Sequence, residues 1–314
     1  MNMNTDKRNT DKRNTDSYIR AIAELKSVSA AADRLGVTQP ALSASLKKKE
    51  QELGTLLFDR SKQPIELTEA GKAYLDYIEK QDQLASEMQQ QLADIAGMQV
   101  GRLTVGGAIA FNIAYLPRAI HEFNTKYPRI DINILDRNVP ELVNEALKGN
   151  VDLFLTPQND DTDRFNYAEL LEEKLLLCVP STIAKELKLA HKRVGREEFC
   201  EMCKHTFVML RDDQDVGMKM NELAEFYGCE PSLVVRAEQT LSTLAMSMSG
   251  VGISLISEGS MKNLNIREED SQVKLYELDT DICKRKLYVA WPKNKYLSKS
   301  AEEFIRMLQE VNND

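Results

Sequence analysis

Histidine is scarce in this sequence, and the short motifs of several enzyme classes are missing. The 314 residues include three histidines, His121, His191 and His205, and none has a second histidine four residues later, as a zinc-protease helix requires. No Gly-x-Ser-x-Gly turn occurs, and no phosphate-binding loop ends in Gly-Lys-Ser or Gly-Lys-Thr. The sequence therefore predicts a protein that is not an enzyme and that carries no metal and no cofactor.

Long apolar runs are also missing. No run approaches the length of a membrane span and no signal peptide opens the chain, so we expect a cytoplasmic protein without a membrane partner. The composition, 42% hydrophobic and 29% charged, fits two or three compact units. The formal charge of -8 does not exclude a nucleic-acid partner, because the local charges set the field near a phosphate.

The chain is organised around the segment from Ala30 to Glu50, whose pattern predicts two short helices joined by a tight turn. Gly36 adopts positive φ at little cost and so can end the first helix. Thr38 is expected to cap the second helix with its hydroxyl, and Pro40 falls in the first turn, where no backbone donor is lost. Such a pair is a helix-turn-helix, although an ordinary helical hairpin in a core has the same pattern.

The second of these helices has one apolar face and one polar face. Leu42 and Leu46 fall on the face that would be buried, and Gln39, Ser43 and Lys47 recur on the outward face. Small polar side chains there suit the edges of bases, and lysines suit phosphates.

A short polar hairpin with an apolar anchor at each end follows the two helices. Phe58 and Leu67 are the anchors, and Arg60 and Lys62 lie between them, as in a wing beside a helix-turn-helix. Together these segments resemble the LysR-type transcriptional regulators. The matching residues are Ala31, Ala32, Leu35, Thr38 to Ser43, Glu50, Gly54, Leu57, Phe58, Arg60 and Leu67 to Gly71.

The resemblance implies a transcriptional regulator that binds a pseudo-palindromic operator in double-stranded DNA, with RNA polymerase as a candidate further partner. Lys49 departs from the pattern, since the family usually has a core leucine there, and its amine is expected to extend to solvent or to loosen the packing. The DNA-binding residues would be Arg34, Thr38, Gln39, Pro40, Ser43, Lys47, Lys48, Arg60 and Lys62.

The first residues form a polar tandem repeat, in which Thr5-Asp6-Lys7-Arg8-Asn9 recurs as Thr10-Asp11-Lys12-Arg13-Asn14. We expect residues 1–15 to be disordered, because they offer nothing apolar to bury. The basic residues would also suit a DNA-contacting arm, but the aspartates weaken that reading. A first helix should begin at Asp16 or Ser17, and the winged helix-turn-helix should span residues 16–68.

Residues 69–97 predict one long amphipathic helix, ended by Gly97. Tyr74, Ile78, Ala85, Met88 and Leu92 recur at helical spacing along it. The helix could pack on its own domain. The resemblance implies instead a linker helix that pairs with the helix of a second copy, in a homodimer or a homotetramer.

The chain after Arg102 changes to alternating strands and helices. Strands are predicted at 103–106, 130–135, 151–155, 175–179, 206–210, 233–235, 250–256 and 286–291, and helices at 111–126, 140–148, 240–249 and 298–311. This order is typical of parallel α/β sheets. The fold class is therefore α/β, preceded by an all-α winged helix-turn-helix and a long linker helix.

The resemblance implies that residues 98–314 form an effector-binding domain of the type 2 periplasmic-binding-protein-like fold. We expect the chain to cross between two subdomains near Cys178 to Ser181 and near Asp279 to Cys283. Subdomain I would contain 101–178 and 283–314, and subdomain II 179–282. A solute-binding protein is the rival interpretation, but it predicts an export signal and no helix-turn-helix.

Ligands of open α/β units bind beyond the carboxyl ends of the strands, which predicts a site for a small-molecule effector between the subdomains. Thr240 would add a helix N-terminus whose free amides suit an anion. Many relatives carry Ser or Thr where this chain has Ala108 to Ala110, which favours a more apolar effector, or none, over a simple carboxylate. The candidate residues, each of which could equally be connecting chain, are Ala108, Ile109, Ala110, Asp136, Thr156, Pro157, Thr206, Phe207, Thr240 and Ser242.

The five cysteines are an odd number in a chain without an export signal, which favours reduced thiols. Cys200-x-x-Cys203 with His205 could hold a metal or form a redox pair, but no second pair completes a zinc site. Cys178 and Cys283 flank the two crossings, so we expect them to lie near each other. A ligand-independent or cysteine-redox-controlled regulator is the alternative to effector control.

Overall fold

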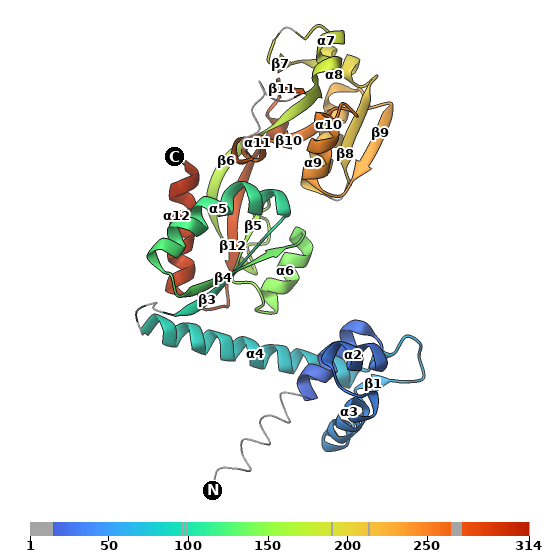
Figure 1. Ribbon diagram of the computed structural model, residues 1–314, viewed down its shortest axis with the longest axis vertical. Helices are drawn as coiled ribbons and strands as arrows, with labels where there is room; N and C mark the ends of the chain where they lie inside the picture. The colour runs from blue at the N-terminus through green and yellow to red at the C-terminus, as the bar shows by residue number, and fades with distance from the viewer. Residues whose placement is uncertain are drawn as a thin grey trace. The chain divides into compact units, whose positions relative to one another are not determined.

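The computed structural model describes residues 15–95, 97, 100–189, 191–212, 214–264 and 272–313. The tandem repeat at residues 1–14, which we expected to be disordered, lies outside these ranges. The chain divides into two compact units between Ser86 and Glu87 (Figure 1). The expected DNA-binding segment falls in the first, or winged, unit, and the expected effector-binding segment falls in the second, or α/β, unit.

In the described part of the winged unit, from residue 15 on, three helical segments precede the hairpin. Residues 15–25 are helical, so the chain is already helical at Thr15 and the expected cap at Asp16 or Ser17 is wrong. The next helices are α2 (Val28–Leu35) and α3 (Gln39–Leu53). Gly36 ends α2 at a φ of 65°, as predicted. Leu42 and Leu46 are 0% and 1% exposed in the core of this unit, which confirms the predicted buried face of α3.

The cap of α3 differs from the prediction. Thr38 has the extended backbone of an N-cap residue, but its side chain makes no capping hydrogen bond. An N-cap side chain normally accepts from the amide of the second or third helical residue, and Pro40 occupies the second position and has no amide hydrogen. The hydroxyl of Thr38 therefore loses one of its two usual donors.

A hairpin and a long helix complete the winged unit. β1 (Phe58–Asp59) and β2 (Glu66–Leu67) pair antiparallel with Phe58 opposite Leu67, which confirms the predicted wing. α4 (Glu69–Ile95) is one helix, as predicted, and it continues into the second unit. The first part of its apolar stripe packs within the winged unit, because Tyr74 and Ile78 are buried in that unit's own core. Pairing with a second chain through those two residues is therefore ruled out.

The α/β unit is built on a continuous path of strands. Their order is β4 (Ile130–Asp136), β3 (Gly101–Gly107), β5 (Leu153–Thr156), β12 (Lys284–Pro292), β6 (Phe165–Pro180), β11 (Val273–Leu278) and β7 (Arg193–Val194), and β10 (Ser254–Ser257) also pairs with β6. β8 (Thr206–Leu210) and β9 (Leu233–Ala237) form a separate parallel pair, joined to the rest by a bridge from Phe207 to Ile253. The parallel pairs confirm the predicted α/β class.

Helices cover the two halves of this unit (Figure 1). The first half carries α5 (Ile109–Lys126), α6 (Val139–Leu147) and α12 (Lys299–Asn313). The second half carries α7 (Ser181–Glu186), α8 (Arg196–Met202), α9 (Asp215–Tyr227), α10 (Thr240–Met248) and α11 (Glu258–Asn263), and a 3-10 turn, η1 (Asp281–Cys283), leads back to β12.

Strand β6 belongs to both halves. Its first part, to Lys174, pairs with β12, and its last part, from Leu175, pairs with β10 and β11. The first crossing is therefore at Lys174 and Leu175, and not at Cys178 to Ser181 as expected. The apolar run from Leu175 marks the start of the second core rather than the end of the first. The second crossing, at η1, is where the sequence predicted it.

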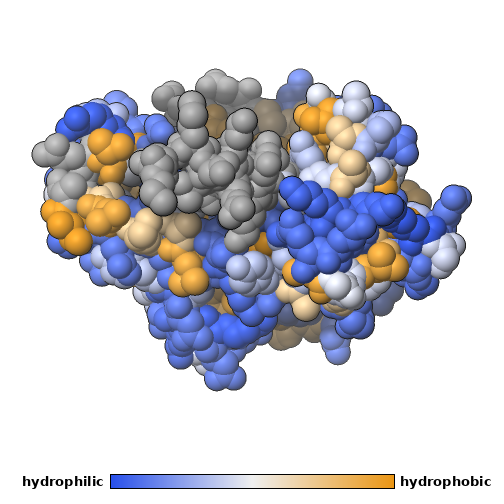
Figure 2. Space-filling model, turned by 90° about the horizontal axis from the view of Figure 1, so that it is seen from below, coloured by the Kyte–Doolittle hydropathy of each residue, from blue (hydrophilic) through white to orange (hydrophobic). Residues whose placement is uncertain are grey.

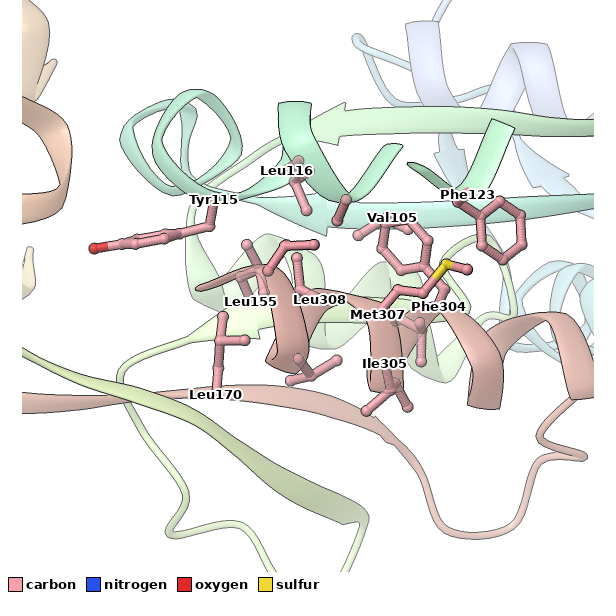
Figure 3. Packing of buried hydrophobic residues seen from close by; sticks show 14 of the residues in the cluster. Val105, Tyr115, Leu116, Phe123, Leu155, Leu170, Phe304, Ile305, Met307 and Leu308 are labelled. Atoms are coloured by element: carbon pink, nitrogen blue, oxygen red, sulfur yellow. The ribbon is translucent and has the colours of Figure 1, made fainter. Parts of the chain in front are cut away.

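Each half has its own apolar core. In the first half, α5 and α12 pack on the sheet through Leu116, Phe123, Phe304 and Leu308, among others (Figure 3). Tyr115 belongs to the same core but directs its hydroxyl away from these side chains (Figure 3). On the face shown in Figure 2, hydrophobic residues form separate groups among hydrophilic ones. In the described part of the chain, no helix has the length and apolar character needed to cross a lipid bilayer.

Candidate functional site

The outward face of α3 carries the polar side chains that the sequence predicted for it. Gln39, Lys47 and Lys48 are exposed, and Ser43 is half-buried. Among the described residues, Lys47 and Lys48 have no ion-pair partner, so their charges are available to an external anion. Arg34, at the end of α2, pairs with Glu24 at 2.8 Å.

A groove separates α3 from the wing. It has a volume of about 450 Å³ and brings Gln39 and Ser43 on one side opposite Arg60 and Lys62 on the other. Both wing cations have intramolecular partners, since Arg60 lies 3.0 Å from Glu50 and Lys62 lies 2.6 Å from Glu66. Both side chains of the Lys62 pair are exposed, and the hydrogen bond to the Glu66 carboxylate raises the pKa of Lys62. The groove therefore combines polar hydrogen-bonding groups with two cations.

Glu50 positions the wing, a role that the sequence analysis did not assign. It is 5% exposed, and its Oε1 accepts hydrogen bonds from the backbone amides of Leu57, at 2.9 Å, and Phe58, at 3.4 Å. Its Oε2 accepts from Arg60 at 3.0 Å. One buried carboxylate on α3 thus fixes the first strand of the wing and one of its cations.

The structure shows how Lys49 is accommodated at the position where the LysR-type pattern usually has a leucine. Its side chain is 13% exposed, with the amine 5.5 Å from the centre of the Tyr74 ring and 3.5 Å from Glu52. The aliphatic part of the lysine therefore packs where a leucine would lie, and its charge reaches a carboxylate and an aromatic face.

The loop after β3 leads into the N-terminus of α5. Ala108 is the N-cap residue and makes no side-chain cap, and Ala108, Ile109 and Ala110 are half-buried. The buried Asn112 donates to the carbonyl of Gly107, at 3.1 Å, and to Asp136, at 2.7 Å. Asp136 therefore has a structural partner in this loop.

Several of the remaining candidates for effector contact are buried or lie at the wrong end of a strand. Thr156 is 1% exposed, and its hydroxyl accepts from the amide of Gln158 at 3.1 Å, next to Pro157 in the same loop. Thr206 begins β8 and so lies at the amino end of that strand, whereas the carboxyl end is at Leu210. Phe207 is 0% exposed inside the second core. Residues beyond Leu210 are the ones that the strand-end rule should have selected.

Thr240 and Ser242 lie in the first turn of α10, as predicted, and both are half-buried. A cluster between the two halves, which the sequence did not predict, is formed by Tyr115, Glu173, Asp215 and Arg285. No local pattern marks it, because Glu173 and Arg285 are 112 positions apart.

The cysteines are arranged differently from the predictions. Cys200 forms a disulfide with Cys229 and does not pair with Cys203. The expectation of reduced thiols is therefore wrong for Cys200 and Cys229. Cys203 points into the second core, where burial raises the pKa of its thiol to about 11. Cys178 and Cys283 are not paired as neighbours: Cys178 is opposite Ser254 and Leu275, whereas Cys283 precedes Lys284, which is opposite Lys174. Burial raises the pKa of each thiol to about 12. Within the described ranges, no group of three or more His, Cys, Asp or Glu side chains is placed to hold a metal ion.

Two family models match this chain. The model described as a bacterial regulatory helix-turn-helix protein of the lysR family matches residues 17–72, and the model described as a LysR substrate binding domain matches residues 96–313.

Individual proteins are also similar over nearly the whole chain. The HTH-type transcriptional regulator YybE of Bacillus subtilis is 25% identical over 91% of this chain and 94% of its own length. The HTH-type transcriptional activator CmpR of a Synechocystis strain is 24% identical over 92% of this chain and 91% of its own. Among solved structures, full-length CbnR in complex with its target DNA has a TM-score of 0.67 and 22% identity, covering 95% of this chain and 98% of CbnR.

Proposed function

Because the chain belongs to the LysR family of DNA-binding transcriptional regulators, we propose that α3 reads the bases of its operator from the major groove. Gln39 and Ser43 would contact base edges, and Lys47 and Lys48 would contact phosphates, with Arg34, Thr38 and Pro40 at the rim of the contact. The observation that carries this proposal is the groove between α3 and the wing, which places Gln39 and Ser43 opposite Arg60 and Lys62.

The charges of this face suit DNA even though the chain is acidic overall. Lys47 and Lys48 are exposed and can neutralise phosphates, which releases counterions from the DNA. This contribution to affinity depends on the charges near the phosphates and not on the net charge of the chain. Arg60 is 49% exposed while it pairs with Glu50, so its remaining donors can turn to a phosphate without leaving the carboxylate. The wing would therefore add phosphate contacts beside the recognition helix.

We propose that the exposed stripe of α4 pairs with the same stripe of a second copy. Large apolar side chains along this stripe are between 46% and 82% exposed: Tyr77, Leu84, Met88, Leu92 and Ile95. Apolar residues at this spacing on a long helix are typical of a helix–helix seam. A dimer would place two copies of α3 on the half-sites of a pseudo-palindromic operator.

Met88→Glu with Leu92→Glu tests this seam. Both replacements would put charges into a desolvated contact, so we expect the oligomer to dissociate in sedimentation velocity. Gln89→Glu, on the exposed side of the same turn, is the matched control and should leave the oligomer intact. An unchanged sedimentation coefficient in the double variant would contradict the proposed seam.

We propose that a small-molecule effector binds between the two halves of the α/β unit. The loop of Ala108 to Ala110 and the first turn of α10, with Thr240 and Ser242, lie at carboxyl ends of strands and support this site. The effector would shift the balance between two arrangements of the halves and so change how the winged units meet DNA, where RNA polymerase is a further predicted partner.

The Cys200–Cys229 disulfide favours one second candidate function, which is control by oxidation. Operator binding by protein treated with reductant and then with oxidant distinguishes the two. Effector control predicts equal affinity in both states, and redox control predicts a difference that Cys200→Ser abolishes.

Sequencing of genomic fragments retained by the purified full-length protein tests the proposed DNA recognition. We expect enrichment of one inverted repeat, because a dimer reads two half-sites in opposite directions. Fragments without a shared motif would contradict sequence-specific binding.

A further inference from the structure

A buried pair of opposite charges lies beside the point where β6 and β12 pass between the two halves of the α/β unit. Glu173 and Arg285 are directly opposite each other on these strands, next to the opposed pair of Lys174 and Lys284. They are 5% and 8% exposed. The Nε and Nη2 atoms of Arg285 donate to Oε1 of Glu173 at 2.8 Å and 2.5 Å.

Each half of the unit adds one further side chain to this pair. Tyr115, on α5 of the first half, donates its hydroxyl hydrogen to Oε2 of Glu173. Asp215, the first residue of α9 in the second half, accepts from Nη1 of Arg285. The ring of Phe111, also on α5, lies 5.0 Å from the guanidinium carbon. The cluster therefore joins the crossing strands to both halves at once.

The distribution of charge makes only one of these contacts easy to open. If Asp215 leaves, Arg285 keeps its two hydrogen bonds to Glu173, so no buried cation is left unpaired. Asp215 itself has a side chain that is 21% exposed and sits in the first turn of α9, where a carboxylate is stabilised by the helix dipole and by water. Separation of Glu173 from Arg285, by contrast, would strand two charges in the interior.

The backbones of the two halves also approach closely at this cluster. α11 of the second half packs against α5, with Gly259 facing Tyr115. A Cβ atom at position 259 would lie 2.1 Å from the hydroxyl oxygen of Tyr115, and 2.7 Å from the ring carbon that bears it. No side chain fits between Gly259 and Tyr115 in this arrangement, so the contact exists only while the halves are close together.

We propose that Asp215 and Arg285 form a reversible latch, supported by the Gly259–Tyr115 contact, that holds the two halves of the α/β unit together. Release of Asp215 is the step by which the halves separate. The hydrogen bonds and the close approach at the cluster support the latch, and only its role in admitting an effector rests on the proposed function.

Hydrogen exchange of the full-length protein, read by mass spectrometry, tests the latch with four variants, of which three change or conserve a charge and the fourth, Gly259→Ala, changes none. Asp215→Asn keeps the shape of the side chain and removes its charge, and Asp215→Glu restores the charge. Asp212→Asn is the matched control, because Asp212 pairs with Arg236 within the second half, at 2.7 Å.

We expect Asp215→Asn to speed exchange roughly tenfold or more in the facing segments 109–119 and 257–264, because the acceptor of the hydrogen bond from Arg285 loses its charge. Asp215→Glu and Asp212→Asn should exchange like the parent chain in these segments. Gly259→Ala, which changes no charge, should give the same local pattern as Asp215→Asn by wedging α11 from α5.

Parent-like exchange in both Asp215→Asn and Gly259→Ala would overturn the latch. A uniform rise across both cores in these variants would also overturn it, because it would show a loss of general stability and not an opening between the halves. DNA binding by the same samples reports on the winged unit separately, so a failure of the proposed DNA recognition would be seen independently.

Discussion

Glu50→Ala should release the wing while leaving the helices of the winged unit folded. The carboxylate of Glu50 is the acceptor for the amides of Leu57 and Phe58, which are 0% and 1% exposed. In the alanine variant neither amide has a replacement partner from the side chain, and the burial of both residues keeps water away. The first strand of the wing would therefore lose its attachment to α3.

The expected cost follows from these contacts. Each buried donor left unpaired costs about 1–3 kcal/mol. The bond from Phe58 is long, at 3.4 Å, and should count about 1 kcal/mol, so the two amides together should cost about 2–4 kcal/mol. The charge of Arg60 adds little, because its side chain is 49% exposed and can be solvated. Glu50→Gln retains one carbonyl oxygen for the amides and should cost only about 1–2 kcal/mol.

Hydrogen exchange of the amides between Leu57 and Leu67 measures this effect in the full-length protein. A loss of 2–4 kcal/mol corresponds to exchange that is about 30- to 900-fold faster. Arg60→Ala is the control that removes only the ion pair and should change exchange by less than about fivefold. Equal exchange in Glu50→Ala and Arg60→Ala would refute the reasoning that the two buried amides carry the attachment.

Three further predictions concern charge and thiol chemistry. Lys47→Ala should weaken binding to every DNA sequence and lower the salt slope by about one, whereas Lys72→Ala should not, and titrations at several salt concentrations decide between them. Glu303 accepts from Lys126 and Arg306, which lowers its pKa from 4.5 to about 2, so its stabilisation is present above pH 4.5 and lost as pH falls toward 2. Urea unfolding should show Glu303→Gln to be about 1–2 kcal/mol less stable at pH 7, with a difference from the parent that shrinks in acid. Cys178 and Cys283 should resist iodoacetamide at pH 8 until denaturant is added, because burial raises the pKa of both thiols to about 12, and modification of the folded chain in mass spectra would contradict this.

The local elements were readable from the sequence because local rules govern them. Gly36 and Pro40 bound the helix-turn-helix through φ preferences, and the strand predicted at 206–210 is β8 itself. The stripe of α4 was also visible as a helical period. Its division into a buried part, with Tyr74 and Ile78, and an exposed part was not, because tertiary packing decides which turns are covered.

The features that depend on contacts distant in sequence were not predictable. Strand β6 continues through both halves of the α/β unit. The apolar run that begins at Leu175 therefore marks the point where β6 passes from the first core to the second, and not a separate strand. The pairing of Cys200 with Cys229 follows from the packing of α8 and α9, and the short spacing to Cys203 suggested a different partner. Arg285 and Glu173 carry no motif, and only the register of two distant strands brings them together.

Base recognition by α3 is tested most directly by comparing Gln39→Ala with Gln51→Ala on the selected operator and on versions with single base changes. Both glutamines are exposed on the same helix, but only Gln39 lines the groove between α3 and the wing. Fluorescence anisotropy should show that Gln39→Ala loses about 1–3 kcal/mol on the operator and no longer discriminates at one base position of each half-site, while Gln51→Ala behaves like the parent chain. Unchanged affinity and discrimination in Gln39→Ala would contradict the assignment of α3 as the element that reads DNA.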